Sequence, residues 1–182
     1  MAAALRERWP RYKAGMPFEF TPLAEADLTM LQGWLRLPHV AQWWGPADPL
    51  DELREDFLRG GTTRAFIARL GGEAVGFVQC YVVLGSGDGW WPDETDPGAR
   101  GIDQFLAHQA LLNQGLGRAM VRAFVAKLFE DPAVSVVQTD PSPDNPRAIR
   151  CYAAAGFEAV GEVVTPDGAA LLMRCRRRAE RR

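Results

Sequence analysis

Residues 113–118 read Asn-Gln-Gly-Leu-Gly-Arg and lead into a segment with the pattern of an amphipathic helix. Apolar residues recur there on one helical face, at Leu116, Met120, Phe124 and Leu128. Glycine lets the backbone approach a ligand closely, and the first N–H groups of a helix have no partner within the helix. These properties favour a phosphate-binding turn at the helix start, although an ordinary tight turn can carry the same letters.

Residues 145–157 carry a second, independent signal. Asn145 suits the N-cap of a helix, Pro146 its first position, and Gly156 the left-handed residue that ends it. Asn145 and Tyr152 are seven residues apart, almost two turns, so they project from the same side of this helix. Taken singly, Asn145 is an ordinary cap and Tyr152 an aromatic at the edge of the core. Together with the glycine turn, the pair favours a shared ligand.

Hydrophobic periodicity places both motifs in a chain of mixed strands and helices. Strands are predicted at residues 18–23, 101–107 and 134–139, with hairpins at 64–70 with 73–84 and at 157–164 with 168–175. Helices are predicted at residues 24–37, 116–129 and 145–156, with short helical pieces between 38 and 60. The fold class is therefore α/β (α+β), with a central mixed, mostly antiparallel sheet of about seven strands and about four flanking helices.

One segment between the predicted strands is a loop of unusual length. Residues 85–101 are too polar and too rich in Gly and Pro for a regular element. A loop this long inside a compact domain is usually functional. We therefore expect it to contribute to a binding site.

Length and composition fit one globular domain. The chain has 182 residues, 47% hydrophobic and 24% charged, and no apolar run approaches the roughly 20 residues that span a bilayer. We expect a single domain over residues 18–176, between an N-terminal extension at 1–17 and a basic tail at 177–182. The N-terminus lacks the apolar core of a secretory signal, which favours the cytoplasm.

Charge and cysteine usage narrow the class of ligand. The net charge is -2 although the C-terminus is strongly basic, so the rest of the chain is more acidic than the total indicates. An acidic body suits a cationic small molecule better than a nucleic acid. Neither a disulfide framework nor a metal site is predicted from the cysteines and histidines, which are Cys80, Cys151, Cys175, His39 and His108.

The order of these elements and motifs resembles the GNAT superfamily of N-acetyltransferases. The resemblance rests on the Gly-x-Gly helix start and on the N-x-x-A-x-x-x-Y-x-x-x-G-F helix at residues 145–157. The stretches GSGDGWWPDETDPGARGIDQ (85–104), QTDPSPDNPRAIRCYAAAGF (138–157) and TPDG (165–168) are similar to the aminoglycoside 6'-N-acetyltransferases of Gram-negative resistance determinants. This closer resemblance covers residues 43–173. It implies a GNAT fold and acetylation of the 6'-amine of aminoglycosides, which confers resistance.

The resemblance also implies where acetyl-CoA binds. The implied contacts lie on the glycine turn, on the strand before it and on the later helix, at Gln104, Phe105, Asn113, Gln114, Gly115, Leu116, Gly117, Arg118, Asn145 and Tyr152. No histidine pattern indicates an activated serine or cysteine nucleophile. We therefore expect direct transfer without an acyl-enzyme.

The reaction needs groups that move protons. An alkyl ammonium must lose a proton before its nitrogen attacks a thioester, and a carboxylate can accept it. The resemblance places Asp103 beside the acceptor amine, where it acts as the base if its pKa is raised from about 3.9, or otherwise only orients the amine. Tyr152 is the expected acid for the departing thiolate, and the Gln104 N–H the expected donor to the oxyanion.

The expected acceptor site is acidic and aromatic. Several carboxylates match a polycationic sugar, and by resemblance they are Asp88, Asp103, Asp140 and Asp167. Indoles suit the apolar faces of sugars and nearby cations, and the candidates are Trp43, Trp44, Trp90 and Trp91. The alternatives are ordinary turn roles for Asp140 and Asp167, and core packing for at least one tryptophan of each pair.

Two other functions remain open. A GNAT enzyme of this size could acetylate a siderophore precursor, a polyamine or a protein N-terminus, for which a narrower and less acidic acceptor cleft is expected. A non-catalytic module could bind acyl-CoA or a drug without turnover, although the presence of both Asp103 and Tyr152 argues against it. We expect small-molecule partners only, and a monomer or weak homodimer.

Overall fold

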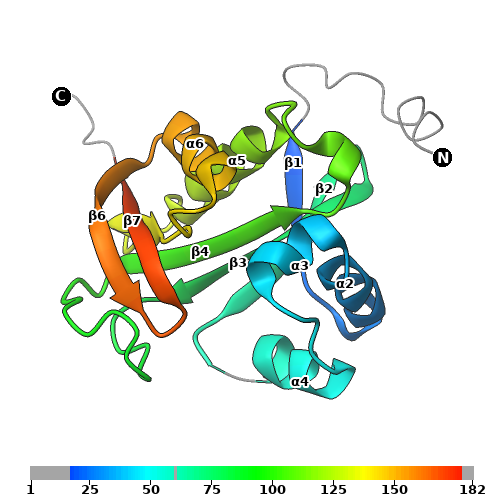
Figure 1. The fold of residues 1–182 in the computed structure, drawn as a ribbon, viewed down its shortest axis with the longest axis horizontal. Coiled ribbons are helices and arrows are strands. Elements are labelled where there is room, and N and C mark those ends of the chain that lie inside the picture. The colour runs from blue at the N-terminus through cyan, green and yellow to red at the C-terminus, as the bar shows by residue number, and fades with distance from the viewer. Residues whose placement is uncertain (1–16, 60, 178–182) are drawn as a thin grey trace. The chain divides into compact units, whose positions relative to one another are not determined.

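The computed structural model describes residues 17–59 and 61–177. Its strands form a seven-stranded sheet in the order β1-β2-β3-β4-β5-β7-β6. The described residues divide into two compact units, the first with residues 17–79 and 104–120 and the second with residues 80–103 and 121–177. Three elements contribute to both units: β3 (Glu73–Val82), β4 (Ala99–Leu106) and α5 (Leu116–Leu128) (Figure 1).

In the first unit the sheet begins with an antiparallel pair. β1 (Phe18–Pro22) pairs with β2 (Arg64–Leu70), from Phe18↔Leu70 to Pro22↔Phe66. β2 and β3 are neighbours in the sheet and are joined by Gly71 and Gly72, with φ of 59° and 82°. Two positive φ values are the signature of a type I′ hairpin turn. The first predicted hairpin is therefore confirmed.

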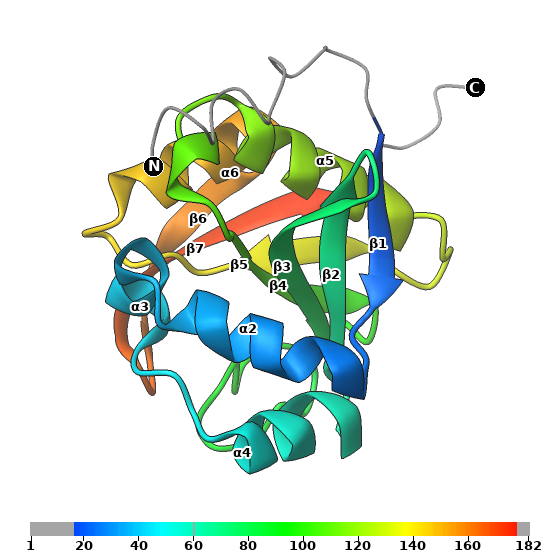
Figure 2. The same ribbon diagram turned by 90° about the vertical axis from the view of Figure 1, so that its right-hand side faces the viewer.

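The helical part of the first unit lies between β1 and β2 in the chain. It comprises η1 (Glu25–Asp27), α2 (Leu28–Leu35), α3 (Pro38–Trp44), α4 (Leu50–Arg54) and the π-helical η2 (Glu55–Arg59). Figure 2 shows α2 and α4 side by side, in agreement with their backbone contacts. Prolines and glycines between residues 38 and 60 break the segment into short pieces, as the sequence predicts.

Two apolar clusters cover opposite faces of β2. Leu31 of α2, Leu53 of α4 and Ile67 of β2 share one buried cluster. The next residue in β2, Ala68, belongs to a second cluster with Met120 of α5. Successive strand side chains point to opposite faces, so β2 separates these two layers of the first unit.

In the second unit, β5 (Val136–Thr139) is the central strand of a mixed arrangement. It pairs in parallel with β4 and antiparallel with β7 (Gly168–Arg176), which pairs antiparallel with β6 (Glu158–Thr165). Figure 1 shows β6 and β7 as a hairpin, which confirms the second predicted hairpin. The β4–β5 pairing runs from Ala99↔Val136 to Gly101↔Gln138.

α6 (Pro146–Ala155) has the predicted boundaries. The Asn145 side chain caps its start by accepting a hydrogen bond from the Ala148 N–H at 3.1 Å. Gly156 ends it with a left-handed φ of 109°. The signals at both ends are local, which is why the sequence was sufficient to locate them.

The structure corrects the sequence in several places. Five α-helices occur in the described residues, in line with the predicted helices and the short helical pieces expected after α2; the corrections concern strand boundaries. The strand predicted at 134–139 begins at Val136, since the Val134 N–H closes a turn on the Asp131 carbonyl at 3.1 Å. β4 begins at Ala99 and ends at Leu106, where residues 101–107 were predicted.

Some expectations concern the ends of the chain. The predicted extension at 1–17 and tail at 177–182 lie outside the described residues, except for Pro17 and Arg177. Arg177 donates hydrogen bonds to the Phe129 and Val134 carbonyls, at 2.6 and 2.9 Å. Among the described residues, no helix combines the length and apolar character needed for a bilayer span.

Candidate active site

The predicted phosphate-binding turn lies in the first unit and leads into α5. Asn113 and Gly115 have left-handed φ of 60° and 80°. The helical hydrogen bonds begin with the Ala119 N–H, which donates to the Gly115 carbonyl at 3.0 Å. The N–H groups of residues 116–118 therefore have no acceptor within the helix.

This turn fits a diphosphate group. A helix N-terminus carries partial positive charge, and its amides can donate to phosphate oxygens. Gly115 is exposed, and a Cβ added there would meet only the Arg118 guanidinium, at 3.7 Å. Leu116 is 3% exposed and anchors the helix start in the core, so the amides sit on a fixed element.

Tyr152 lies in the second unit, on α6. It is 4% exposed, and its ring meets Phe157 edge to face with centroids 5.4 Å apart. The single-residue interpretation is confirmed for Asn145, which is a helix cap, whereas Tyr152 is buried in the core rather than placed at its edge. Neither excludes a ligand, because the packing fixes the ring and leaves the role of the hydroxyl open.

Three of the four predicted acceptor carboxylates interact in the second unit. We call Asp103, Asp140 and Asp167 the acidic cluster. Burial raises the pKa of Asp140 to about 7, and repulsion from the charges of Asp103 and Asp167 acts in the same direction. Asp140 is thus a carboxyl that changes protonation near neutral pH.

Strand register explains why two members of the acidic cluster meet. Asp103 and Asp140 each come two residues after the last β4–β5 pair, Gly101↔Gln138. Side chains two residues apart in a strand share a face. Asp103 in β4 and Asp140 directly after the end of β5 therefore follow the same parallel pairing, in agreement with their electrostatic interaction.

Tyr81 is a site residue that the sequence did not reveal. A Cβ on Gly101 would lie 2.1 Å from its Cζ and 2.5 Å from its hydroxyl oxygen, so the ring rests on the Gly101 backbone. Burial raises the pKa of Tyr81 well above its usual range, and the charges of Asp103 and Asp140 raise it further. The Tyr81 hydroxyl therefore stays protonated within the electric field of these carboxylates.

Two of the four predicted tryptophans pack against apolar groups. Trp44 lies in the first unit with its ring edge to face against Phe77 and Phe105, at 5.6 and 5.1 Å. Trp91 packs against the buried cluster of the second unit that contains Val83. The packing alternative therefore fits one member of each pair. The other members, at positions 43 and 90, are half-buried.

Two further predicted residues in β4 belong to the first unit. Phe105 is 7% exposed and stacks on Phe77 with centroids 5.5 Å apart. Gln104 is half-buried beside it in the strand. Any contact of Phe105 with a ligand would thus be made by its backbone rather than its ring.

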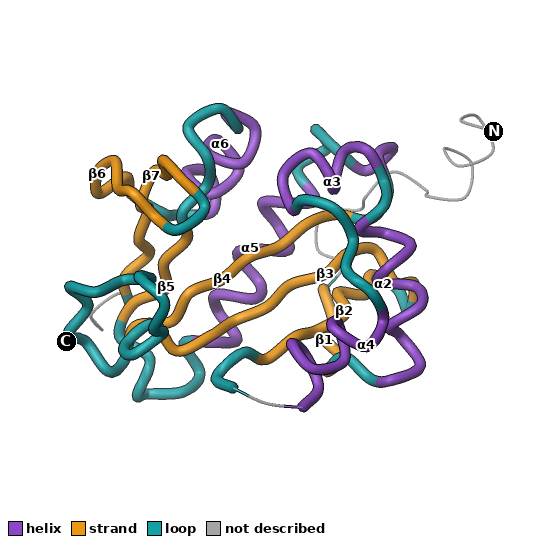
Figure 3. The backbone as a smooth tube through the Cα atoms, turned by 60° about the horizontal axis from the view of Figure 1, so that its bottom comes forward, coloured by secondary structure: helices purple, strands orange, loops and turns teal. Residues whose placement is uncertain are grey.

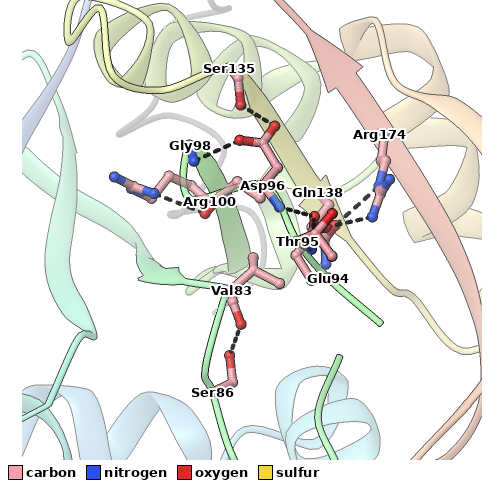
Figure 4. Close-up of polar contacts among 11 residues, drawn as sticks. Val83, Ser86, Glu94, Thr95, Asp96, Gly98, Arg100, Ser135, Gln138 and Arg174 are labelled. Carbon is pink, nitrogen blue, oxygen red and sulfur yellow. Dashed lines mark hydrogen bonds and ion pairs between the residues drawn. The ribbon is translucent and has the colours of Figure 1, made fainter. Parts of the chain in front are cut away.

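The long loop between β3 and β4 comprises residues 83–98 and is confirmed as a loop (Figure 3). Ser86 donates to the Val83 carbonyl at 2.6 Å, and Asp96 accepts from the Ser135 hydroxyl at 2.6 Å (Figure 4). Asp88 lies at the exposed tip with a positive φ of 48°, inside the Gly87↔Trp90 bridge. The loop is thus tied down near both ends.

Two buried donors near this loop lack a conventional partner. Among the described residues, the Trp91 indole nitrogen and the Gln138 amide nitrogen are buried without a hydrogen bond of regular geometry. The Trp91 N–H is nevertheless near enough to the Tyr81 hydroxyl oxygen to lower the pKa of Tyr81, an effect smaller than that of burial. Buried donors of this kind are usually satisfied by water or a ligand.

Comparison with known proteins agrees with this arrangement. Residues 24–165 match the acetyltransferase (GNAT) domain family. Aminoglycoside N(6')-acetyltransferase type 1 of Klebsiella pneumoniae is 51% identical over 158 residues, which cover 83% of this chain and 79% of the relative. A kanamycin resistance protein of Rhizobium radiobacter is 62% identical over 84 residues, which cover 46% of this chain and 78% of the relative.

Solved structures give the same result. The crystal structure of aminoglycoside acetyltransferase AAC(6')-Ib in complex with coenzyme A and kanamycin is 49% identical and has a TM-score of 0.83, with 88% of this chain and 95% of that chain covered. The GNAT fold implied by the sequence resemblance is confirmed. The chain therefore belongs to the GNAT acetyltransferases and, among them, to the family of the aminoglycoside N(6')-acetyltransferases.

Proposed function

We propose that this protein transfers the acetyl group of acetyl-CoA directly to the 6'-amine of aminoglycoside antibiotics and thereby confers resistance to them. The observation that carries the proposal is the acidic cluster, in which burial and like charges raise the pKa of Asp140 to about 7. Such a cluster suits an acceptor with several ammonium groups, one of which must lose a proton before it reacts. The family relationship supports the same substrate class.

The donor binds, in this proposal, at the start of α5. Acetyl-CoA supplies an acyl carbon already activated as a thioester. The amides of residues 116–118 hold its diphosphate, with the left-handed backbone at Asn113 and Gly115 shaping the turn. Gln114 and Arg118 lie beside these amides, and the exposed Arg118 adds positive charge. The Gln104 and Phe105 backbone and the α6 residues Asn145 and Tyr152 complete the proposed contacts.

The acidic cluster binds the acceptor and removes its proton. The carboxylates of Asp103 and Asp167 attract the ammonium groups. Asp140, with a pKa of about 7, is better matched than an ordinary aspartate to accept a proton at neutral pH. Of the two roles that the sequence leaves open for Asp103, base or orienting group, we assign it the second, and Asp140 acts as the base. Asp88 contributes from the tip of the long loop.

Tyr152 acts at the other end of the reaction. When the tetrahedral intermediate collapses, the departing thiolate needs a proton, and a phenol can provide it. The Tyr152 ring is held by Phe157, so its hydroxyl has a defined position. The Gln104 N–H stabilises the oxyanion, since a backbone donor needs no reorganisation.

The function is tested by thiol release from acetyl-CoA with a panel of acceptors. Kanamycin and ribostamycin should give turnover, whereas spermidine, a lysine derivative and a peptide with a free N-terminus should give little. Preferred turnover of any of the last three would favour the rival acetylases. Binding of acetyl-CoA and kanamycin without thiol release would favour the non-catalytic module.

We also propose the domain organisation, cellular location and oligomeric state of the protein. Residues 18–176 act as one acetyltransferase domain, which the family match over residues 24–165 supports. The protein works in the cytoplasm, where acetyl-CoA is made and used, and as a monomer or weak homodimer. Sedimentation of the purified chain and fractionation of expressing cells test these two points.

A further inference from the structure

Arg174 of β7 lies on the same face of the second unit as the acidic cluster. Gln138 of β5 pairs with Gly101 of β4 on one side and with Arg174 of β7 on the other. Paired residues of neighbouring strands present their side chains on the same face. Arg174 therefore lies on the face that holds Tyr81 over Gly101, one row away from the positions of the carboxylates.

Arg174 is engaged by two partners from distant parts of the chain. Its Nε donates to Gln138 Oε1 at 3.1 Å, and its Nη2 donates to Glu94 Oε2 at 2.7 Å (Figure 4). Gln138 is fully buried, and the Glu94 side chain is 8% exposed. The pair is thus largely removed from water, where loss of one partner leaves a costly unpaired charge.

Glu94 is also bound to the long loop itself. Its Oε1 accepts from the Thr95 and Asp96 N–H groups at 3.0 and 2.8 Å. Its own N–H donates to the Trp91 carbonyl at 3.0 Å. One carboxylate therefore joins the loop backbone to Arg174, and hence to β7.

The anchored part of the loop reaches the acceptor carboxylates through two aromatic residues. Trp91 packs on the buried cluster that also receives Tyr81, and its indole N–H is near the Tyr81 oxygen. Tyr81 in turn interacts with the charges of Asp103 and Asp140. A shift of the loop at Glu94 would therefore change the groups around the acidic cluster.

We propose that Glu94 and Arg174 are positioning residues for the acceptor: their ion pair fixes the long loop against β7 and cancels the positive charge of Arg174 on the face that receives the aminoglycoside. This inference rests on the proposed function, because it assumes a polycationic acceptor at the acidic cluster. The pair touches no reacting atom. Its effect is on acceptor binding, and the donor turn at the start of α5 is independent of it.

The first test compares steady-state kinetics of three variants. Glu94→Gln keeps the shape but leaves Arg174 unpaired, so kcat/KM for kanamycin should fall by about 10- to 100-fold, mainly through KM, while KM for acetyl-CoA changes by less than about twofold. Arg174→Gln leaves Glu94 unpaired and should weaken the loop in the same way. The double variant Glu94→Gln/Arg174→Gln has two amides that can bond to each other and no charge, so it should recover most of the lost affinity for kanamycin.

A matched control uses an exposed ion pair of the first unit. Arg59 and Glu55 lie 2.5 Å apart with side chains 62% and 60% exposed. Glu55→Gln makes the same chemical change at a site with no proposed role and should leave both KM values unchanged. Thermal melts of every variant set the assay temperature, so that only folded protein is compared.

A second readout does not need the acceptor reaction. Hydrogen exchange of residues 83–98 in the ligand-free protein should be faster in Glu94→Gln than in the wild type, and close to the wild type in the double variant. If the wild type acetylates no aminoglycoside, the proposed function fails, and this exchange measurement still tests the anchoring. Unchanged exchange together with an unchanged KM for kanamycin in Glu94→Gln would overturn the inference. So would a double variant whose KM is no lower than that of Glu94→Gln.

Discussion

Replacement of Asp140 by Asn should stabilise the folded protein at neutral pH while it abolishes most acetyl transfer. In the folded protein the pKa of Asp140 is raised from 3.8 to about 7, chiefly by burial and then by the charges of Asp103 and Asp167. Between these two values the folded state keeps a proton that the unfolded state has lost. The free energy of unfolding therefore falls as the pH rises through this window. Asn has nearly the same shape as Asp and carries no charge. The free energy of unfolding of Asp140→Asn therefore does not fall in this way as the pH rises.

The size of the effect follows from the raised pKa. A difference of one in pKa corresponds to about 1.4 kcal/mol, so the full window from about pH 4 to pH 7 is worth up to about 4 kcal/mol. Between pH 5 and pH 8 the wild type covers about two thirds of this window, so its free energy of unfolding falls by about 3 kcal/mol. For a chain of this length each kcal/mol shifts Tm by about 2–4 °C, so the gap in Tm between Asp140→Asn and the wild type should widen by about 6–12 °C.

The assay is thermal unfolding of the ligand-free proteins, followed by circular dichroism at pH 5, 6, 7 and 8. Asp144→Asn is the matched control, because Asp144 is an exposed aspartate in the turn before α6. The gap in Tm should change more with pH for Asp140→Asn than for Asp144→Asn. The reasoning is refuted if the gap for Asp140→Asn is constant across this range or is smallest at pH 8. Activity of the same variant is measured at pH 8, where loss of a base should appear in kcat.

Three further variants test single parts of the structure. Gly101→Ala places a Cβ 2.1 Å from the Tyr81 ring and should lower the free energy of unfolding by about 1–3 kcal/mol. Adding Tyr81→Ala to this variant should restore part of the loss. Equal Tm values for Gly101→Ala and the wild type would contradict the packing of Tyr81 on Gly101. Asn145→Ala removes the 3.1 Å cap to the Ala148 N–H and should lower stability by about 1 kcal/mol, measured by urea unfolding, whereas no loss would mean that the cap is not needed. Tyr152→Phe should lower kcat by about 10²–10⁴-fold with little change in KM for kanamycin, provided that single-turnover kinetics show chemistry to be limiting; an unchanged kcat would count against the acid role.

Features set by neighbouring residues could be predicted from the sequence. The start and end of α6 follow from Asn145, Pro146 and Gly156, and the first hairpin follows from Gly71 and Gly72, because caps and two-residue turns depend on local backbone chemistry. The glycine turn at α5 belongs to the same class. The structure has a left-handed Gly115 in this turn, while its role in donor binding stays a prediction.

Features that depend on contacts between distant segments could not be predicted. The raised pKa of Asp140, about 7, depends on burial and on the charges of Asp103 in β4 and Asp167 in the turn between β6 and β7, which lie far apart in the chain. Tyr81 looks like any aromatic residue in a strand, and only Gly101 hints that a ring rests there. Arg174 and Glu94 are 80 residues apart in the chain, and neither carries a motif.

The aromatic candidates show the same limit. Indoles in Gly- and Pro-rich segments suggest sugar binding, yet Trp44 packs against Phe77 and Phe105 in the first unit. Burial and stacking use the same residue type for two purposes, and composition does not separate them. The long loop was predicted as a loop, but its attachment to β7 depends on the Glu94 ion pair rather than on its length.

If the acidic cluster presents the 6'-amine of an aminoglycoside to the acetyl donor, the product carries its acetyl group on the 6' nitrogen. The wild-type protein is incubated with acetyl-CoA and kanamycin, and two-dimensional NMR of the purified product locates the new amide. One acetyl group on the 6' nitrogen is predicted, together with no thiol release from an aminoglycoside that has a hydroxyl in place of the 6'-amine. An acetyl group on another nitrogen, or equal thiol release from the 6'-hydroxyl compound, would contradict the account.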